Sequence, residues 1–177
     1  LLANATGGWQ PVAGEGGHVT LAASTDREAA VIRQVREDHD HVSAERLVSG
    51  PGLLCLHGAL HALADTPEQA RLQTPTPEAI TRAAIAGDPL AGEALSLFFD
   101  FLATTASNLA VTLGAFGGVN LAGGIIPQLL PQLEASGFLE RFNAKGRYQR
   151  YLRAMPIAVV VHPQPAFPGL IRLLDTP

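Results

Sequence analysis

Three glycine-bordered segments carry the side chains that could bind a small polar molecule. The first, residues 14–19 (GEGGHV), contains Glu15 and His18, which can accept and donate hydrogen bonds to the hydroxyls of a polyol. Glycines on both sides of Glu15 allow backbone conformations that other residues avoid, and they let a ligand approach the chain closely. A purely structural explanation stays open, in which the segment is a turn that leaves a hairpin and Glu15 faces solvent.

The second segment, residues 41–46 (HVSAER), runs directly into residues 49–52 (SGPG). A short helical turn that glycine and proline interrupt at once would fix the direction of Glu45. Such fixing is what a carboxylate needs when it must meet a pair of sugar hydroxyls. The alternative is an exposed pair of neighbouring charges, Glu45 and Arg46, without a binding role.

The third segment, residues 113–127 (LGAFGGVNLAGGIIP), has a short apolar strand followed by Gly123 and Gly124 and then by Pro127, which can open a helix. This order lets a nucleotide lie against the backbone near a helix N-terminus. The segment lacks the spacing of a dinucleotide-binding loop and the Lys and Ser/Thr of a phosphate-binding P-loop. Spacing alone therefore indicates a nucleotide site only weakly.

The elements that must position these segments follow from hydrophobic periodicity. The expected helices cover residues 26–38, 43–48, 53–64, 76–86, 89–113, 127–134 and 138–144. The expected strands are a hairpin at residues 1–5 and 9–13 and two buried strands at residues 119–122 and 156–162. We expect a surface connection at residues 65–77 and a short proline-rich tail after Pro163. Strands and helices alternate, so the predicted fold class is α/β, with residues 89–113 as the central helix.

Composition limits the classes of protein to consider. With 177 residues, 47% of them hydrophobic and 16% charged, the chain can bury the core of one ordinary domain. A net charge of −4 and twelve scattered Lys and Arg residues argue against a nucleic-acid partner. No continuous apolar run reaches about 18 residues, so we expect no membrane span. The chain opens on Leu1 inside an apparent strand, which indicates a piece of something longer.

Cysteine and histidine give weaker signals. Cys55 is the only cysteine, so it forms no internal disulfide; it favours a reducing, cytoplasmic location, and we expect a small buried residue. His57, His61 and Asp65 recur every four residues, and two histidines one helical turn apart can bind zinc. We favour a solvated or subunit-facing stripe over a metal site. Aromatic residues are expected in the core or at an interface, namely Trp9, Phe98, Phe99 and Phe101.

The three segments, in this order, resemble bacterial glucokinases of the non-ROK type. The similarity extends over residues 9–165 and includes residues 94–98, 136–138, 145–147, 156–157 and 161–162. It implies a ribonuclease-H-like, actin-like ATPase domain, a sheet flanked by helices, with residues 1–177 as a single large C-terminal domain and the N-terminal lobe absent. The related ROK sugar kinases carry a cysteine-rich zinc motif, which a chain with Cys55 alone does not match.

The resemblance also implies roles for residues. Glu15, His18 and Glu45 match positions that hydrogen-bond the sugar, and Gly123 and Gly124 match the adenosine-binding part of the domain. The intact protein would phosphorylate glucose with ATP and Mg²⁺. Long apolar helices with exposed-looking faces favour a homodimer.

Other parts of the family pattern are missing. The Asn-Asp pair that supplies the general base and two glycine- and threonine-containing phosphate loops do not occur in this sequence. Residues 167–171 replace a glycine-rich turn that the family has before its final helix. We therefore expect no catalytic residue and no resident metal in this chain, and weak or undetectable phosphorylation by the chain alone. The alternative is a non-catalytic sugar-binding or dimerising module.

Overall fold

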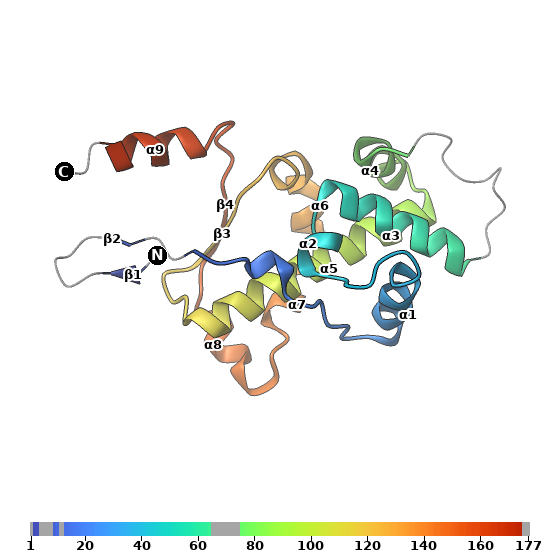
Figure 1. Ribbon diagram of the computed structural model, residues 1–177, viewed down its shortest axis with the longest axis horizontal. Helices are drawn as coiled ribbons and strands as arrows, with labels where there is room; N and C mark the ends of the chain where they lie inside the picture. The colour runs from blue at the N-terminus through green and yellow to red at the C-terminus, as the bar shows by residue number, and fades with distance from the viewer. Residues whose placement is uncertain (1, 4–8, 11–12, 65–74, 175–177) are drawn as a thin grey trace.

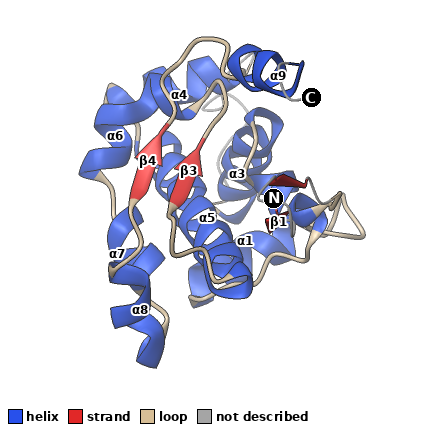
Figure 2. Ribbon diagram, turned by 90° about the vertical axis from the view of Figure 1, so that its left-hand side faces the viewer, coloured by secondary structure: helices blue, strands red, loops and turns tan. Residues whose placement is uncertain are grey.

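Helices form most of the molecule, and a short parallel sheet lies beside the long central helix (Figures 1 and 2). The computed structural model describes residues 2–3, 9–10, 13–64 and 75–174. The α-helices are α1 (Asp26–Val35), α2 (Ala44–Leu47), α3 (Gly50–Leu63), α4 (Pro77–Ile85), α5 (Pro89–Leu113), α6 (Leu130–Ala135), α7 (Phe138–Asn143), α8 (Gln149–Arg153) and α9 (Ala166–Leu174). Short 3₁₀ helices are η1 (Gly16–His18), η3 (Ile126–Leu129) and η4 (Gly146–Tyr148). The strands are β1 (Leu2–Ala3), β2 (Trp9–Gln10), β3 (Val119–Leu121) and β4 (Ile157–Val159). The chain is thus α/β, as the sequence predicts.

The central helix α5 organises the packing of the body. It is 25 residues long and contacts α3, α4 and α7. The Asp88 carboxylate caps its start by accepting a hydrogen bond of 2.8 Å from the Ala91 amide, and Gly114 ends it in the left-handed conformation. Its aromatic side chains are buried as predicted, namely Phe98, Phe99 and Phe101.

By length and composition alone, α5 is apolar enough to cross a membrane, although no membrane span was predicted from the sequence. Its most apolar window has a mean hydropathy of 1.4, yet 61% of that window is buried inside the protein. The contacts with α3, α4 and α7 therefore account for its apolar character, as they do for the core helix of a packed domain.

The break between α2 and α3 is shorter than predicted, because α3 begins at Gly50, three residues earlier than expected. The Ser49 hydroxyl accepts a hydrogen bond of 3.0 Å from the Gly52 amide, and the Pro51 ring fits the first helical turn. A side chain at Gly52 would collide with the backbone carbonyl of Leu47, at the end of α2. Glycine is therefore needed where the two helices meet.

Strands β3 and β4 form the parallel pair that the alternation of elements predicts. Their register aligns Val119–Leu121 with Ile157–Val159. The close approach of the strands requires Gly118, since a Cβ there would lie 2.7 Å from the carbonyl oxygen of Pro156. β4 ends before the predicted strand does, because β3 provides only three residues for pairing, and Val161 is exposed.

The two ends of the chain differ in how well the sequence predicts them. β1 and β2 pair antiparallel, which confirms the hairpin, although residues 1, 4–8 and 11–12 and the Trp9 side chain lie outside the described part. The tail instead contains a helix, α9, which stands apart from the body in Figure 1. This helix was not predicted in the proline-rich tail, and it is possible because Pro168 falls in the first turn of α9, where a helix tolerates proline. The helix α8 was also not predicted, and most of the predicted connection at residues 65–77 lies outside the described residues.

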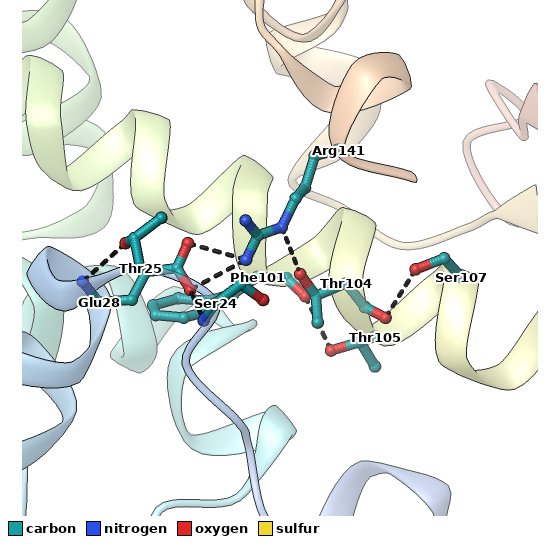
Figure 3. A network of polar contacts seen from close by, with 8 residues as sticks. All are labelled: Ser24, Thr25, Glu28, Phe101, Thr104, Thr105, Ser107 and Arg141. Carbon is teal, nitrogen blue, oxygen red and sulfur yellow. Dashed lines mark hydrogen bonds and ion pairs between the residues drawn. The ribbon is translucent and has the colours of Figure 1, made fainter. Parts of the chain in front are cut away.

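A buried polar network joins α1, α5 and α7 (Figure 3). The Arg141 guanidinium donates hydrogen bonds to both carboxylate oxygens of Glu28, at 2.8 and 2.9 Å, and to the Thr104 hydroxyl at 2.9 Å. Glu28 is 1% exposed, and its carboxylate also accepts a bond of 2.6 Å from the Ser24 amide. Burial raises the pKa of nearby Asp100, although the Arg141 charge opposes that rise. The network fixes α1 against the central helix and was not predicted from the sequence.

Candidate functional site

A backbone bridge brings the first two sequence segments together. Thr20 and Ser43 form an antiparallel bridge, in which the Leu21 amide donates to the Val42 carbonyl at 3.0 Å. The Ala44 amide donates to the carbonyl on the other side of the bridge, that of Val19, at 2.9 Å. The segment that follows η1 therefore runs alongside the segment that leads into α2.

This bridge places His18 opposite Glu45. The His18 Nε2 atom lies 3.7 Å from the Glu45 Oε2 atom, and the two side chains are 63% and 60% exposed. The Glu45 carboxylate thus faces the imidazole. Both polar groups remain open to a ligand from solvent.

Small residues make the contact between the turn and α2 possible. A Cβ on Gly17 would lie 3.1 Å from the Glu45 Oε2 atom and 3.3 Å from the Glu45 Cβ atom. A Cβ on Gly16 would lie 3.6 Å from a methyl group of Leu109, so the turn rests on the central helix. Glycine at both positions lets η1 fit between α2 and α5.

Glu15 belongs to the same turn but is held differently. It precedes η1, and its carbonyl accepts a hydrogen bond of 3.0 Å from the His18 amide. Its side chain is exposed and makes no hydrogen bond or ion pair with another described residue. We call Glu15, His18 and Glu45 the carboxylate–imidazole cluster. Its backbone positions are set by the turn and the bridge, while the Glu15 carboxylate is left available.

The direction of Glu45 is set by its short helix. The Ser43 hydroxyl caps α2 by accepting a bond of 3.1 Å from the Arg46 amide, and Ala44 and Leu47 are buried beneath it. The His41 Nε2 atom lies 3.1 Å from the Thr20 hydroxyl oxygen and adds a side-chain contact across the bridge. His41 was part of the sequence segment, but this contact could not be foreseen because it depends on residues far apart in the chain.

The third segment forms an open loop after β3. Gly123 has a φ of +132°, which side chains rarely adopt, and a Cβ on Gly123 or Gly124 would meet nothing within 4 Å. The Gln128 side-chain amide donates a hydrogen bond of 2.8 Å to the Gly124 carbonyl, which ties the loop to η3. Both glycines are exposed, so a ligand can approach the backbone here.

A pocket of about 410 Å³ lies beside this loop. Part of its wall consists of three buried side chains, those of Leu53, Phe98 and Leu129. The loop contributes Gly124, Ile125 and Gln128, and α4 contributes Glu78, Thr81, Arg82 and Ile85. We call this the glycine-loop pocket. The contribution of α4 could not be predicted from the sequence, because nothing in the pattern of residues 76–86 connects that helix to Gly123 and Gly124.

The start of α3 lies between the cluster and the pocket. A Cβ on Gly50 would lie 3.6 Å from the Pro77 ring and 4.0 Å from the Ile125 side chain. The N-terminal ends of α3 and α4 and the loop after β3 therefore meet at Gly50, five residues after Glu45. One region can thus offer polar side chains to a polyol and the other a concave surface to a larger ligand.

Comparison with other proteins assigns this arrangement to a family. A family model described as Glucokinase matches residues 1–176. The chain belongs to the glucokinase family. The glucokinase of Paramagnetospirillum magneticum is 46% identical over 178 residues, which cover 100% of this chain and 54% of that protein. The glucokinase of Aromatoleum aromaticum is 47% identical, over 95% of this chain and 50% of that protein.

Solved structures agree with this family assignment. A glucokinase from an Antarctic psychrotroph superposes with a TM-score of 0.84 at 32% identity, covering 94% of this chain and 51% of that one. The glucokinase of Balamuthia mandrillaris in complex with glucose gives a TM-score of 0.72 at 22% identity, over 90% and 46%, and bears on the fold alone. The glucokinase-family chain therefore spans about half the length of the relatives it matches.

The histidines of α3 do not form the exposed stripe that we expected in this glucokinase-family chain. His57 and His61 are 5% and 6% exposed, and their Nε2 atoms lie 3.2 Å apart. Burial lowers the pKa of His57, and the neighbouring His61 lowers it further, whereas Asp88 acts in the opposite direction. α3 packs against α1, α4 and α5, so little of its surface remains exposed. Asp65 lies outside the described residues.

Cys55 is half-buried rather than buried, in a pocket between α1 and α3, and burial raises the pKa of its thiol. Within residues 13–64 and 75–174, no group of three or more His, Cys, Asp or Glu side chains is arranged to hold a metal ion.

Proposed function

We propose that the intact protein to which this chain belongs transfers a phosphate from ATP to glucose, giving glucose 6-phosphate. In this proposal the chain supplies sugar contacts and part of the adenosine site. Membership of the glucokinase family supports the reaction. The observation that carries the proposal is the exposed pair of His18 and Glu45, 3.7 Å apart, with Glu15 in the same turn.

The carboxylate–imidazole cluster suits a sugar because its groups complement neighbouring hydroxyls. A carboxylate accepts hydrogen bonds from two hydroxyl groups at once, and an imidazole can both donate and accept through its two nitrogens. Hydrogen bonds to a charged group contribute about 1.5–3 kcal/mol each. The backbone bridge and the cap of α2 hold His18 and Glu45 in place before a sugar binds, which reduces the entropy lost on binding.

The adenosine part of ATP is proposed to lie at Gly123 and Gly124. The open backbone of the loop and the adjoining pocket support this placement, because ligands of α/β proteins usually bind beyond the carboxyl ends of parallel strands. We propose further that β3 and β4 belong to a larger sheet of the ribonuclease-H-like, actin-like type, with this chain as the C-terminal large domain. Parallel sheets of two strands rarely stand alone, which supports a larger sheet in the intact protein.

Phosphoryl transfer itself needs a base near the attacking hydroxyl and a loop around the phosphates. Neither sequence pattern occurs in this chain, so we assign it binding rather than catalysis. Mg²⁺ is proposed only as the companion of the ATP phosphates, which it usually binds together with waters and one or two carboxylates. The described residues contain no cluster of three metal-ligating side chains to which a resident ion could be assigned.

Two further proposals concern the setting of the protein. A homodimer is supported by the apolar side chains that α9 exposes, which are Phe167, Leu170, Ile171 and Leu174. A cytoplasmic location is supported by the single cysteine and by family membership among bacterial glucokinases.

The variant Glu45→Gln tests the sugar site. Replacing the charged acceptor removes a charge-assisted hydrogen bond, so glucose affinity should fall by roughly tenfold, and in the intact enzyme KM should rise and kcat fall. Isothermal titration of the chain with glucose measures the affinity. Glu37→Gln, an exposed carboxylate after the end of α1, is the matched control and should leave affinity unchanged. Equal glucose affinity in Glu45→Gln and wild type would remove Glu45 from the site.

A further inference from the structure

We infer that α4 supplies the side chains that recognise the base of the nucleotide, with Glu78 accepting a hydrogen bond from the amino group of adenine. This inference rests on the proposed function and deepens it. The glycine loop offers no side chain at Gly123 and Gly124, and the Gly124 carbonyl already accepts a hydrogen bond from Gln128. The charged side chains that line the pocket, Glu78 and Arg82, come from α4 on the other side.

The glycine-loop pocket has the size and composition of a site for a planar heterocycle. Its volume of about 410 Å³ falls in the usual range for small-molecule sites, roughly 300–1,000 Å³. Leu53 and Phe98 are each 2% exposed, so the part of the pocket wall that they form belongs to the packed core. An apolar wall suits the faces of a purine ring, and polar groups around it suit the ring edge.

Existing hydrogen bonds within the protein limit which bonds the polar groups of the pocket can form with a ligand. The Thr81 hydroxyl already donates its proton to the Pro77 carbonyl at 2.7 Å, and Gln128 already donates its amide to Gly124. The Thr81 oxygen can still accept a hydrogen bond, and Gln128 keeps its carbonyl oxygen as an acceptor and its second N–H as a donor. Glu78 is an exposed carboxylate with acceptors only.

Arg82 is the only side chain lining the glycine-loop pocket, as far as the structure describes it, that carries a positive charge. It can donate to a ring nitrogen or lie over the face of the ring. Acceptors at Glu78, Thr81 and Gln128, with donors at Arg82 and the second N–H of Gln128, complement an adenine edge, where an amino group donates beside ring nitrogens that accept. Among the acceptors Glu78 is charged, so it should form the strongest bond to the amino group.

The experiment compares two nucleotides that differ by that amino group. Binding of ATP and of purine riboside triphosphate, which lacks the 6-amino group, is measured by isothermal titration of the 177-residue chain. Wild type should bind ATP about tenfold more tightly, since the difference is one charge-assisted hydrogen bond. Glu78→Ala should bring the two affinities to within about twofold of each other.

Controls separate recognition from charge and folding. Glu134→Ala, an exposed carboxylate on α6 outside this pocket, makes the same charge change and should keep the tenfold preference. Glu78→Gln keeps an acceptor oxygen and the length of the glutamate side chain, which Glu78→Ala does not. This variant should therefore keep part of the preference for ATP over purine riboside triphosphate, with α4 intact. Circular dichroism of each variant verifies that the helices remain folded.

The possible failures have different meanings. If ATP binds but Glu78→Ala keeps the full preference, or if wild type shows none, Glu78 does not read the base and the inference is wrong, while the proposed kinase function stands. If the chain binds neither nucleotide, α4 and the glycine loop do not form a base site in it, and the inference again fails. The proposed function is then judged by the glucose titration of Glu45→Gln, which does not involve this pocket.

Discussion

The carboxylate–imidazole cluster and the glycine-loop pocket are built in opposite ways. In the cluster, a backbone bridge and a capped helical turn hold His18 and Glu45, whose own polar atoms are the binding groups. The pocket is shaped by the missing side chain at Gly124 and by a distant helix, α4. The cluster is therefore specified by residue identity, and the pocket by packing between separate segments. Substitutions can test this contrast.

The largest effect is expected in the buried network that holds α1 against α5 and α7. Arg141→Met leaves the Glu28 carboxylate 1% exposed and without its charged partner, at a cost of about 3–5 kcal/mol in the free energy of unfolding. Denaturant unfolding followed by circular dichroism measures the loss. Adding Glu28→Gln to Arg141→Met removes the unpaired charge and should recover part of it. A loss below about 1 kcal/mol would mean that the network does not hold α1 in place.

The junction of α2 and α3 should respond next. Gly52→Ala puts a methyl group against the Leu47 carbonyl, and relieving that collision should cost about 1–3 kcal/mol and weaken glucose binding through Glu45. Gly58→Ala is the matched control on the same helix, because a Cβ there meets nothing within 4 Å. It should stabilise the protein by up to about 1 kcal/mol. Equal stabilities for the two variants would contradict the close approach of α2 and α3.

The two glycines of the loop should separate stability from binding. Gly123→Ala forces a side chain into a φ of +132° and should cost about 1–3 kcal/mol. Gly124→Ala introduces no such strain, so stability should change by no more than about 0.5 kcal/mol, while the new methyl group reduces nucleotide affinity. Thermal unfolding and nucleotide titration of both variants make the comparison. A similar loss of stability in both would show that backbone conformation does not distinguish the two positions.

The same contrast explains what the sequence could predict. Most helices, the hairpin and the parallel strands follow from periodicity, caps and glycine-proline breaks, all of which are local. Glu45 and His18 could be selected as polar residues in fixed turns, but their 3.7 Å separation follows from the Thr20–Ser43 bridge, which no local pattern shows. The family resemblance was the source of two predictions. One groups Glu15, His18 and Glu45 as a sugar site, and the other makes Gly123 and Gly124 an adenosine contact.

Other features depend on which surfaces meet in three dimensions. The burial of Glu28 depends on Arg141, which lies 113 positions later in the chain and provides its partner. The contribution of α4 to the glycine-loop pocket depends on the meeting of α3, α4 and the loop at Gly50. The burial of His57 and His61 depends on the other helices that pack around α3, so the sequence of α3 alone does not indicate it.

The smallest effect concerns pH and those histidines, which the carboxylate–imidazole cluster does not involve. Burial holds the pKa of His57 below its ordinary value of 6.5, so the folded protein resists a proton that the unfolded chain accepts. Unfolding therefore takes up protons below about pH 6.5, and stability should fall as the pH drops from there toward the folded-state pKa. His57→Gln removes this proton uptake, and the variant should lose less stability than wild type between pH 7.5 and pH 5.5. Denaturant unfolding at both pH values tests the difference, and parallel losses in His57→Gln and wild type would mean that His57 takes up its proton equally well in the folded protein.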